Sequence, residues 1–264
     1  MPLKFCANLS FMFQEAPVLL DRYNLAKCAG FKAVECANPY EYPIEQVVKA
    51  KEDACLEQIL INTPINSVNK ELGYAALGPN YQNKFMQGIH KALEYAKALK
   101  CSVVHIMSGI VECPAQNNKK YLIENLRAVK PLFEGANITG VIEAINPHSV
   151  KNYYLNSYDT AVEVINEVGS PNIRLLMDIY HLQRIKGDLS ISVEKLLPYT
   201  SHVQIAQVPG RQEPNSAGEL DYKYLLGLLE SCSYGGYVGL EYHPAGDTRA
   251  GLNWITEFGY TLNH

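Results

Sequence analysis

Short apolar runs alternate with longer amphipathic segments along the whole chain. The runs are rich in Val, Ile, Leu and Ala and contain few polar positions, which is typical of parallel strands buried on both faces. We predict eight such strands, at Leu3–Asn8, Ala33–Cys36, Gln58–Asn62, Ser102–Met107, Ile138–Asn146, Ile173–Asp178, His202–Ala206 and Tyr237–Tyr242.

The segments between these runs have helical spacing. It is clearest in Tyr81–Leu99, where Phe85, Ile89, Leu93 and Ala96 fall on one face. Further helices are predicted at Pro17–Ala29, from Pro43 to about Cys55, and at Lys119–Phe133, Tyr158–Val168, Val193–Leu197, Asp221–Leu229 and Leu252–Phe258.

One of these helices contains an interior proline. Pro131 lacks a backbone N–H and its ring crowds the preceding turn, so we expect it to kink or end the helix that begins at Lys119.

The alternation predicts a (βα)8 TIM barrel that occupies residues 1–264 as a single domain. Eight strand–helix units of about 33 residues each match the usual size of this fold. A doubly wound sheet is the structural alternative, but no Gly-x-Gly-x-x-Gly turn follows the first strand.

Composition narrows the range of partners and compartments. The net charge of −4 has acids and bases interspersed, so nucleic acid and anionic membranes are not expected partners. No stretch of about 18 apolar residues suggests a membrane span, and the N-terminus lacks a signal-peptide layout. The seven cysteines include no Cys-x-x-Cys pair, which favours the reducing cytoplasm.

Polar residues stand near the ends of the last four predicted strands: Glu143, Asp178, Gln204 and Glu241. Active sites of such barrels lie at the carboxyl ends of the strands. Neighbouring strands lie about 5 Å apart, so these side chains can converge. Three carboxylates this close repel one another unless a cation neutralises them. The oxygen-rich set suits Mg²⁺ or Mn²⁺, with Zn²⁺ or Co²⁺ as further possibilities.

Several further residues fall near the same strand ends. We place His181 in the loop after the sixth strand, where it could donate to a substrate oxygen. Arg211 lies in a Pro/Gly-rich loop after the seventh strand and could bind a substrate carboxylate with two parallel bonds. His105 and Glu35 are also candidates, with substrate contact and a structural role at the barrel rim both open.

Six segments carry a resemblance to a known family. They are Ala7-Asn-Leu-Ser10, Val141-Ile-Glu-Ala144, Met177-Asp-Ile-Tyr-His181, His202-Val-Gln-Ile-Ala206, Pro209-Gly-Arg-Gln-Glu-Pro214 and Gly239-Leu-Glu-Tyr242. In these segments the chain resembles the hydroxypyruvate isomerase family, which belongs to the xylose-isomerase-like barrels and has ketose 3-epimerases as cousins.

The resemblance implies a function for the polar set. A divalent metal would be held by Glu143, Asp178, Gln204 and Glu241, and the two glutamates would be the acid/base pair. The implied enzyme is an intramolecular oxidoreductase that interconverts hydroxypyruvate and tartronate semialdehyde. In the epimerase cousins a histidine stands at the place of Gln204, and an amide is a weaker metal ligand than an imidazole.

Other functions of the same barrel remain open. A ketose 3-epimerase, an isomerase of a longer 2-oxo acid and a lyase such as an inosose dehydratase would use similar chemistry. A non-catalytic sugar-acid binder is a different class. An endonuclease acting on abasic DNA is not expected, because it would need a histidine-rich zinc site and a basic face, whereas the seven histidines here are scattered and the net charge is −4. The segment from Asn62 to Asn80 and the eighteen tyrosines could serve a lid or a homo-oligomer interface.

Overall fold

The computed structural model describes residues 2–66, 71–112 and 117–262. In this part of the chain eight parallel strands form a closed barrel in sequence order, and the last strand pairs with the first. The (βα)8 prediction is therefore confirmed. The strands are β1 (Lys4–Asn8), β2 (Ala33–Cys36), β3 (Glu57–Asn62), β4 (Val103–His105), β5 (Thr139–Glu143), β6 (Ile173–Asp178), β7 (Thr200–Ile205) and β8 (Tyr237–Leu240).

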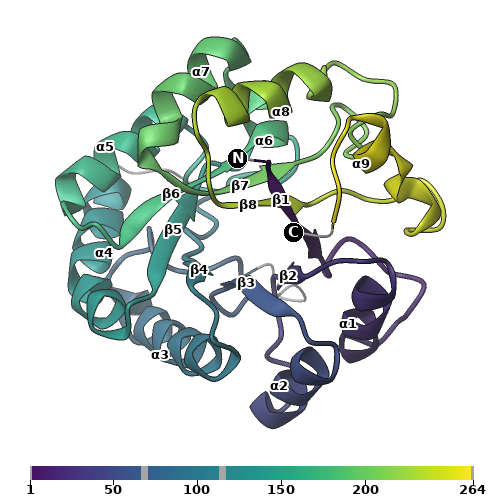
Figure 1. Cartoon of the computed structure of the whole chain (residues 1–264). Helices are drawn as coiled ribbons and strands as arrows, with labels where there is room; N and C mark the ends of the chain where they lie inside the picture. Colours follow the sequence, from purple (N-terminus) through teal and green to yellow (C-terminus); the bar gives the residue numbers. More distant parts are fainter. Residues whose placement is uncertain (1, 67–70, 113–116, 263–264) are drawn as a thin grey trace.

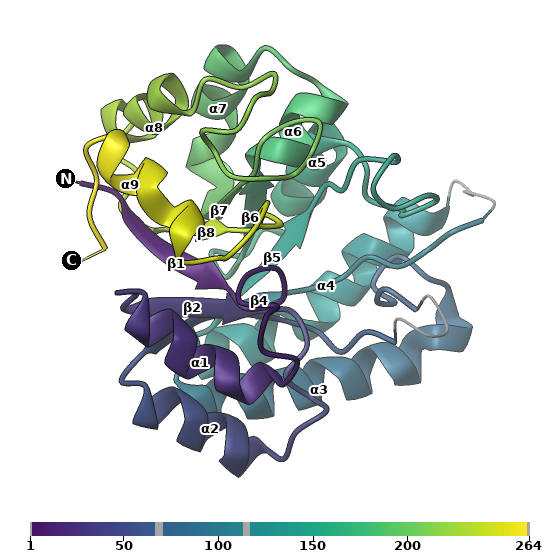
Figure 2. The ribbon, with the colours of Figure 1, turned by 90° about the vertical axis from the view of Figure 1, so that its right-hand side faces the viewer.

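Helices surround the barrel, as Figure 1 shows. They are α1 (Leu19–Cys28), α2 (Ile44–Asp53), α3 (Gln82–Leu99), α4 (Asn117–Ala136), α5 (Tyr158–Val168), α6 (Ile179–Ile185), α7 (Leu189–Leu196), α8 (Tyr222–Ser231) and α9 (Asn253–Glu257). Short 3-10 helices lie at η1 (Pro79–Tyr81), η2 (Leu197–Tyr199) and η3 (Ala250–Leu252). In the side view, α1, α2 and α3 lie on one side of the strands, and α7 and α8 lie on the opposite side (Figure 2).

Several predicted boundaries were wrong. The helix with Pro131 does not end there, because α4 continues to Ala136. The fifth strand ends at Glu143 and not at Asn146, since the Ile145 N–H donates to the Leu155 carbonyl in the following loop, at 2.9 Å. Likewise β4 ends at His105 and β8 at Leu240, so Glu241 lies one residue beyond its strand.

Two predictions fall partly on residues outside the described ranges. Residues 67–70 of the segment between Asn62 and Asn80 are not described, and neither is Cys113. The six described cysteines are free. Within the described ranges, the helices are too short or too polar to cross a membrane.

The strand side chains alternate between two apolar environments. Residues such as Ile61, Val104 and Ile142 belong to the large core that includes the apolar faces of the helices. The residues between them form a separate small cluster inside the barrel: Leu60, Val103, Val141 and Leu176. Because strand side chains alternate with a period of two, the residue two places further along each strand also faces the interior.

Candidate active site

The alternation of side chains along the strands places three polar side chains inside the barrel, nearer the carboxyl ends of the strands than the small apolar cluster. His105 follows Val103 by two residues, and in the same way Glu143 follows Val141 and Asp178 follows Leu176. All three polar side chains are buried. Of the residues predicted to converge, Glu143 and Asp178 therefore lie together at the carboxyl ends of their strands, with His105 beside Glu143.

Four side chains meet at this point: Glu143, Asp178, His181 and Glu241. One ligand atom from each lies within 4.8 Å of those of the others. The His181 Nε2 is 3.8 Å from Glu143 Oε1 and 3.5 Å from Asp178 Oδ2. Glu143 and Glu241, almost a hundred residues apart in sequence, thus belong to one cluster, with Glu241 the more exposed of the two.

The two oxygens of Asp178 have different neighbours. Oδ1 accepts the Tyr180 N–H at 2.8 Å and so caps the start of α6. Oδ2 faces His181 and the Arg211 guanidinium. The expected loop position of His181 was wrong, since this residue lies in the first turn of α6. An aspartate followed by Ile179 and Leu182 at helical spacing is a signal that could have revealed the helix.

Asn146 fixes the proton position on the His181 ring. The Asn146 side-chain oxygen accepts the N–H groups of His148 and Ser149, both at 3.0 Å, so its amide nitrogen must point the other way. That nitrogen lies 2.6 Å from His181 Nδ1, and the Asn146 backbone N–H also donates to Nδ1, at 3.3 Å. Nδ1 is therefore the acceptor, and Nε2 carries the proton toward the carboxylates.

Both histidines of the site are neutral. Burial, with the neighbouring Arg211 charge, lowers the pKa of His181 well below its usual value. Burial, with the nearby His202, lowers the pKa of His105 to about 3. The His105 Nε2 is 3.7 Å from Glu143 Oε2. Each ring can therefore offer or receive a hydrogen bond without adding a charge.

Arg211 lies at the edge of the cluster. Its Nη2 donates to Glu241 Oε2 and is 3.4 Å from Asp178 Oδ2. Its guanidinium lies 4.7 Å from the centre of the Phe11 ring and 4.9 Å from that of Tyr180. These aromatic contacts hold the guanidinium against the site.

The carboxylates repel one another in a buried space. Burial raises the pKa of Glu143 well above its usual value, and the charges of Glu241 and Asp178 raise it further. Burial raises the pKa of Glu241 to about 8 although Arg211 opposes this shift. Burial likewise raises the pKa of Asp178. One guanidinium therefore does not offset the cost of two buried carboxylates and a third, partly buried one, whereas a divalent cation among them would.

Three buried polar atoms have no hydrogen-bond partner within the described residues: His105 Nε2, Glu143 Oε1 and Arg211 Nε. Buried polar groups in proteins are normally satisfied, so each exception requires an explanation. One of them belongs to the cluster and the other two to His105 and Arg211, which lie next to it. The unpartnered atoms and the oxygen-rich donor set fit a site that holds a divalent cation together with a polar substrate.

Gln204 and Glu35 lie next to the cluster. Gln204 on β7 is the register partner of Asp178 on β6, and its Nε2 donates to Glu35 Oε1 at 2.7 Å. Glu35 is fully buried on β2 and contacts His202, so the structure places it inside the barrel. Asn8 was not predicted as a site residue, but its Nδ2 is 3.4 Å from Glu241 Oε1.

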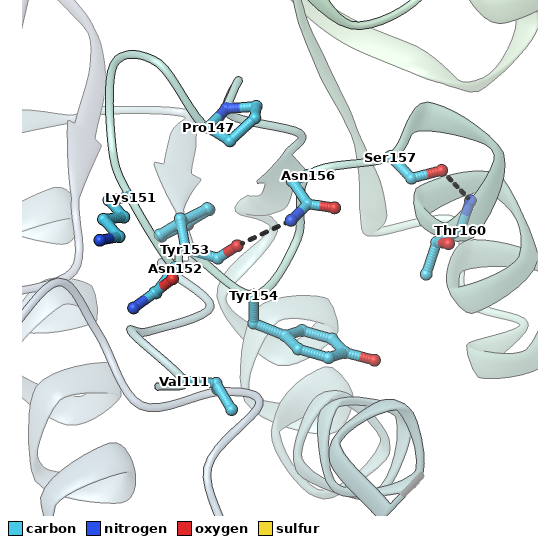
Figure 3. Close-up of a pocket in the computed structure, with 9 residues that line it drawn as sticks. All are labelled: Val111, Pro147, Lys151, Asn152, Tyr153, Tyr154, Asn156, Ser157 and Thr160. Atoms are coloured by element: carbon cyan, nitrogen blue, oxygen red, sulfur yellow. Dashed lines mark hydrogen bonds between the residues drawn. The ribbon is translucent and has the colours of Figure 1, made fainter. Parts of the chain in front are cut away.

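A separate cavity of about 370 Å³ is lined mainly by residues of the loop between β5 and α5 (Figure 3). Its walls include Pro147, Lys151, Tyr154 and Thr160, and none of the predicted site residues lines it. The candidate active site is therefore identified by its converging polar groups and not by this cavity.

Comparison with known proteins agrees with the fold. The family model described as xylose isomerase-like TIM barrel matches residues 23–258. A crystal structure described as AP endonuclease, family 2, from Brucella melitensis has a TM-score of 0.93 and 38% identity, covering 97% of this chain and 99% of that one. A D-psicose 3-epimerase structure with D-fructose has a TM-score of 0.81 at 15% identity, which shows the fold alone.

Curated relatives span the full length of the chain. A Homo sapiens protein that carries the provisional name of a hydroxypyruvate isomerase is 40% identical, over 100% of this chain and 98% of its own. A Haemophilus influenzae 2-oxo-tetronate isomerase is also 40% identical, over 97% of this chain and 99% of its own. The resemblance found in the sequence is thus confirmed, and the chain belongs to the xylose isomerase-like TIM barrel family.

Proposed function

We propose that this protein is an isomerase of a small 2-oxo acid, which interconverts hydroxypyruvate and tartronate semialdehyde. The observation that carries the proposal is the pairing of Glu143 and Glu241 in one buried cluster, with Arg211 beside them. The two curated full-length relatives described above both carry isomerase names, which supports the same reaction class.

Glu143, Asp178, Gln204 and Glu241 would hold a divalent cation, with Mg²⁺ or Mn²⁺ best suited to these oxygen ligands. When bound, such a cation supplies positive charge that stabilises a substrate oxygen as it becomes negative. His181 carries a proton on Nε2, and a protonated nitrogen does not bind a metal. The Gln204 amide oxygen is therefore the fourth ligand of the proposed site. This assignment retains the ligand set inferred from the sequence.

The two glutamates would move the carbon-bound proton. One takes a proton from C3 of hydroxypyruvate, and the same or the other glutamate delivers one to C2, while a hydroxyl proton passes from the C3 oxygen to the C2 oxygen. The His181 Nε2–H points at the carboxylate cluster, where it can donate to a substrate oxygen. His105 is neutral and lies near Glu143 Oε2, whereas His181 lies near Oε1. His105 would therefore contact the substrate from the opposite side of the Glu143 carboxylate.

Arg211 favours an acidic substrate over a neutral sugar. Its Nε has no partner within the described residues, and its guanidinium is held between Phe11 and Tyr180. A planar guanidinium binds a carboxylate through two parallel hydrogen bonds between opposite charges. The hydroxyls of a ketose carry no charge, so they cannot form such an ion pair. This argues for a 2-oxo acid substrate and against a ketose 3-epimerase.

The second candidate is an isomerase of a longer 2-oxo acid. The similarity to the Haemophilus influenzae 2-oxo-tetronate isomerase, equal in identity to that of the human relative, favours it. The Brucella structure raises the endonuclease alternative again, but the described group that could hold a metal contains one histidine and three carboxylates, and the chain has a net charge of −4. DNA binding requires a basic surface, so we do not favour this function.

Proton exchange measured by NMR in D₂O distinguishes these functions. The enzyme with added Mg²⁺ or Mn²⁺ is incubated separately with hydroxypyruvate, 2-oxo-tetronate and D-fructose. We expect deuterium to enter hydroxypyruvate and not D-fructose. Faster exchange into 2-oxo-tetronate would identify the longer acid as the substrate. Exchange into D-fructose alone would contradict the proposal, and no exchange with any of them would favour a binding protein.

Substitution of the two glutamates tests their roles. Glu143→Gln and Glu241→Gln each keep the side-chain size but remove the base, so we expect turnover to fall by about a thousandfold or more. Circular dichroism should show an intact barrel. The control is Glu194→Gln, an exposed glutamate on α7, which should keep wild-type activity. Near-normal activity in either site variant would remove that glutamate from the acid/base pair.

A further inference from the structure

A second polar cluster lies inside the barrel and is not accounted for by proton transfer. Glu35 is fully buried on β2, in the run Ala33-Val34-Glu35-Cys36. Its Oε2 lies 2.6 Å from His202 Nε2, and His202 is also buried. Barrel interiors are usually filled by layers of branched apolar side chains, so a charged group here is costly unless it has a role.

Both oxygens of Glu35 are occupied by donors. Oε1 accepts the Gln204 amide N–H at 2.7 Å and the Asn8 amide N–H at 2.8 Å. Oε2 faces His202, and the Cys6 thiol donates to it at 3.5 Å. An ionised carboxylate can only accept hydrogen bonds, so each of these partners must present a donor.

This requirement fixes the direction of the Gln204 amide. The nitrogen and the oxygen of a side-chain amide lie on opposite branches of one plane. Because the nitrogen is bound to Glu35, the oxygen is directed away from Glu35. Gln204 is the register partner of Asp178, so this oxygen belongs to the part of the barrel where the three carboxylates converge.

The same oxygen of Glu35 also holds Asn8. The Asn8 side-chain oxygen accepts the Ser10 N–H at 2.9 Å, which independently directs its amide nitrogen toward Glu35. That nitrogen is also 3.4 Å from Glu241 Oε1. Glu35 thus binds the proposed metal ligand Gln204 directly and is linked through the Asn8 amide to Glu241, a proposed catalytic glutamate.

Gly239 on β8 provides the space for this arrangement. A Cβ atom at this position would lie only 2.5 Å from Glu35 Oε1. The Glu35 carboxylate therefore occupies the volume that a side chain on β8 would fill, two residues before Glu241. The absence of a side chain at Gly239 is a second and independent sign that the position of this carboxylate is built into the barrel.

We propose that Glu35 is a positioning residue, which orients the Gln204 amide so that its oxygen faces the divalent cation site. The proposal rests on the proposed function, because it assumes that Gln204 is a metal ligand. Glu35 does not touch the substrate. Groups of this kind, which orient a metal ligand from behind, typically change metal affinity by about 10- to 100-fold when they are replaced.

The test is Mn²⁺ binding by the full-length protein, measured by calorimetry after removal of metal with EDTA. Glu35→Gln can donate as well as accept, so it no longer fixes the Gln204 amide. We expect the dissociation constant for Mn²⁺ to rise by about 10- to 100-fold. The matched control is Cys6→Ser, which changes a contact to the other Glu35 oxygen and should stay within about twofold of wild type.

A double variant separates positioning from general damage to the barrel. If Glu35 acts through Gln204, Glu35→Gln should weaken Mn²⁺ binding far less when Gln204→Ala is already present. An equal loss in both backgrounds would overturn the proposal. If Glu35→Gln does not fold, Gly239→Ala displaces the carboxylate while keeping its charge, and it too should weaken binding.

The outcomes distinguish this proposal from the proposed function. A wild-type protein that binds no Mn²⁺ would contradict the metal site itself and, with it, the role of Glu35. A wild-type protein that binds Mn²⁺, with a folded Glu35→Gln variant of equal affinity, would overturn only the positioning role. Isomerase activity then remains to be judged by the exchange experiment alone.

Discussion

At the scale of single residues, Asp178 shows how one side chain serves both fold and site. One of its oxygens caps α6 and the other faces the cluster. Replacing it with alanine would therefore remove a helix cap and a proposed ligand at once. Asp178→Asn keeps a capping oxygen and is the cleaner way to study the ligand role.

His105 leads to a prediction about stability and pH. Its pKa is about 3 in the folded protein, whereas an unfolded histidine has a pKa of about 6.5. The unfolded chain therefore takes up a proton below pH 6.5 and the folded chain does not. Stability from this residue is complete above pH 6.5 and is lost as the pH falls toward 3.

We therefore compare the free energy of unfolding of wild type and His105→Asn at pH 7 and pH 5. We expect it to fall between these pH values by about 2 kcal/mol more in wild type than in the variant. Urea unfolding in EDTA at the two pH values measures the difference. His90→Asn, a change at an exposed histidine on α3, serves as the control and should behave like wild type. Equal pH dependence in wild type and His105→Asn would contradict the expected shift.

The carboxylates of the site could be predicted from sequence, whereas their supporting residues could not. Glu143 and Glu241 stand out because an acid near the end of an apolar run is costly without a partner. Asn146 and Asn8 are ordinary loop and strand-end residues in the sequence. Their roles depend on which side chains face each other across the barrel. The register of the strands decides this, and the register cannot be inferred from residue types.

At the scale of elements, the period-two alternation explains what the sequence could and could not reveal. Apolar runs located all eight strands because both strand faces are buried. They overestimated β5, because Ala144 and Ile145 are buried by loop packing after the strand has ended. Apolar character reports burial, whereas a strand also requires ladder hydrogen bonds.

The helix α4 gives a prediction at this scale. Pro131 is exposed inside α4 and leaves the Arg127 carbonyl without its usual helical donor. Pro131→Ala restores that N–H. Alanine is favoured over proline by about 3 kcal/mol in helix interiors, and the greater freedom of the unfolded chain offsets about 1 kcal/mol of this.

We therefore expect Pro131→Ala to raise the free energy of unfolding by about 1–2 kcal/mol, measured by urea titration. The matched control is Pro79→Ala. Pro79 is the first residue of the 3-10 helix η1. The backbone N–H that alanine would add at this position has no carbonyl acceptor within the helix, so this change should bring no stabilisation. A loss of stability in Pro131→Ala would show that packing of the proline ring outweighs the restored bond.

At the scale of the whole molecule, the barrel brings distant segments to one site. The count and spacing of the strands were enough to predict closure, because few other folds repeat a strand and a helix eight times. Closure also creates contacts that spacing alone does not specify. The pairing of Glu35 on β2 with Gln204 on β7 is one of them, since it crosses the interior.

The proposed cation should stabilise the whole barrel, because it would bind the folded and not the unfolded chain. With free Mn²⁺ at about 100 times its dissociation constant, we expect about 2.7 kcal/mol of added stability. Thermal unfolding should show a melting temperature about 5–10 °C higher than in EDTA. Asp178→Asn should reduce the shift, and unchanged melting with saturating Mn²⁺ or Mg²⁺ would contradict the site.

The pairing of β8 with β1 has a consequence for how the protein is made. The seven earlier strands leave the ribosome first, while Glu241 follows β8 and enters the cluster only after β8 pairs with β1. A chain in which β8 has not yet paired with β1 would therefore lack one member of the proposed acid/base pair. With Glu241 in its proposed role, activity would arise only when the barrel closes, so the onset of activity during refolding would report the pairing of this last strand.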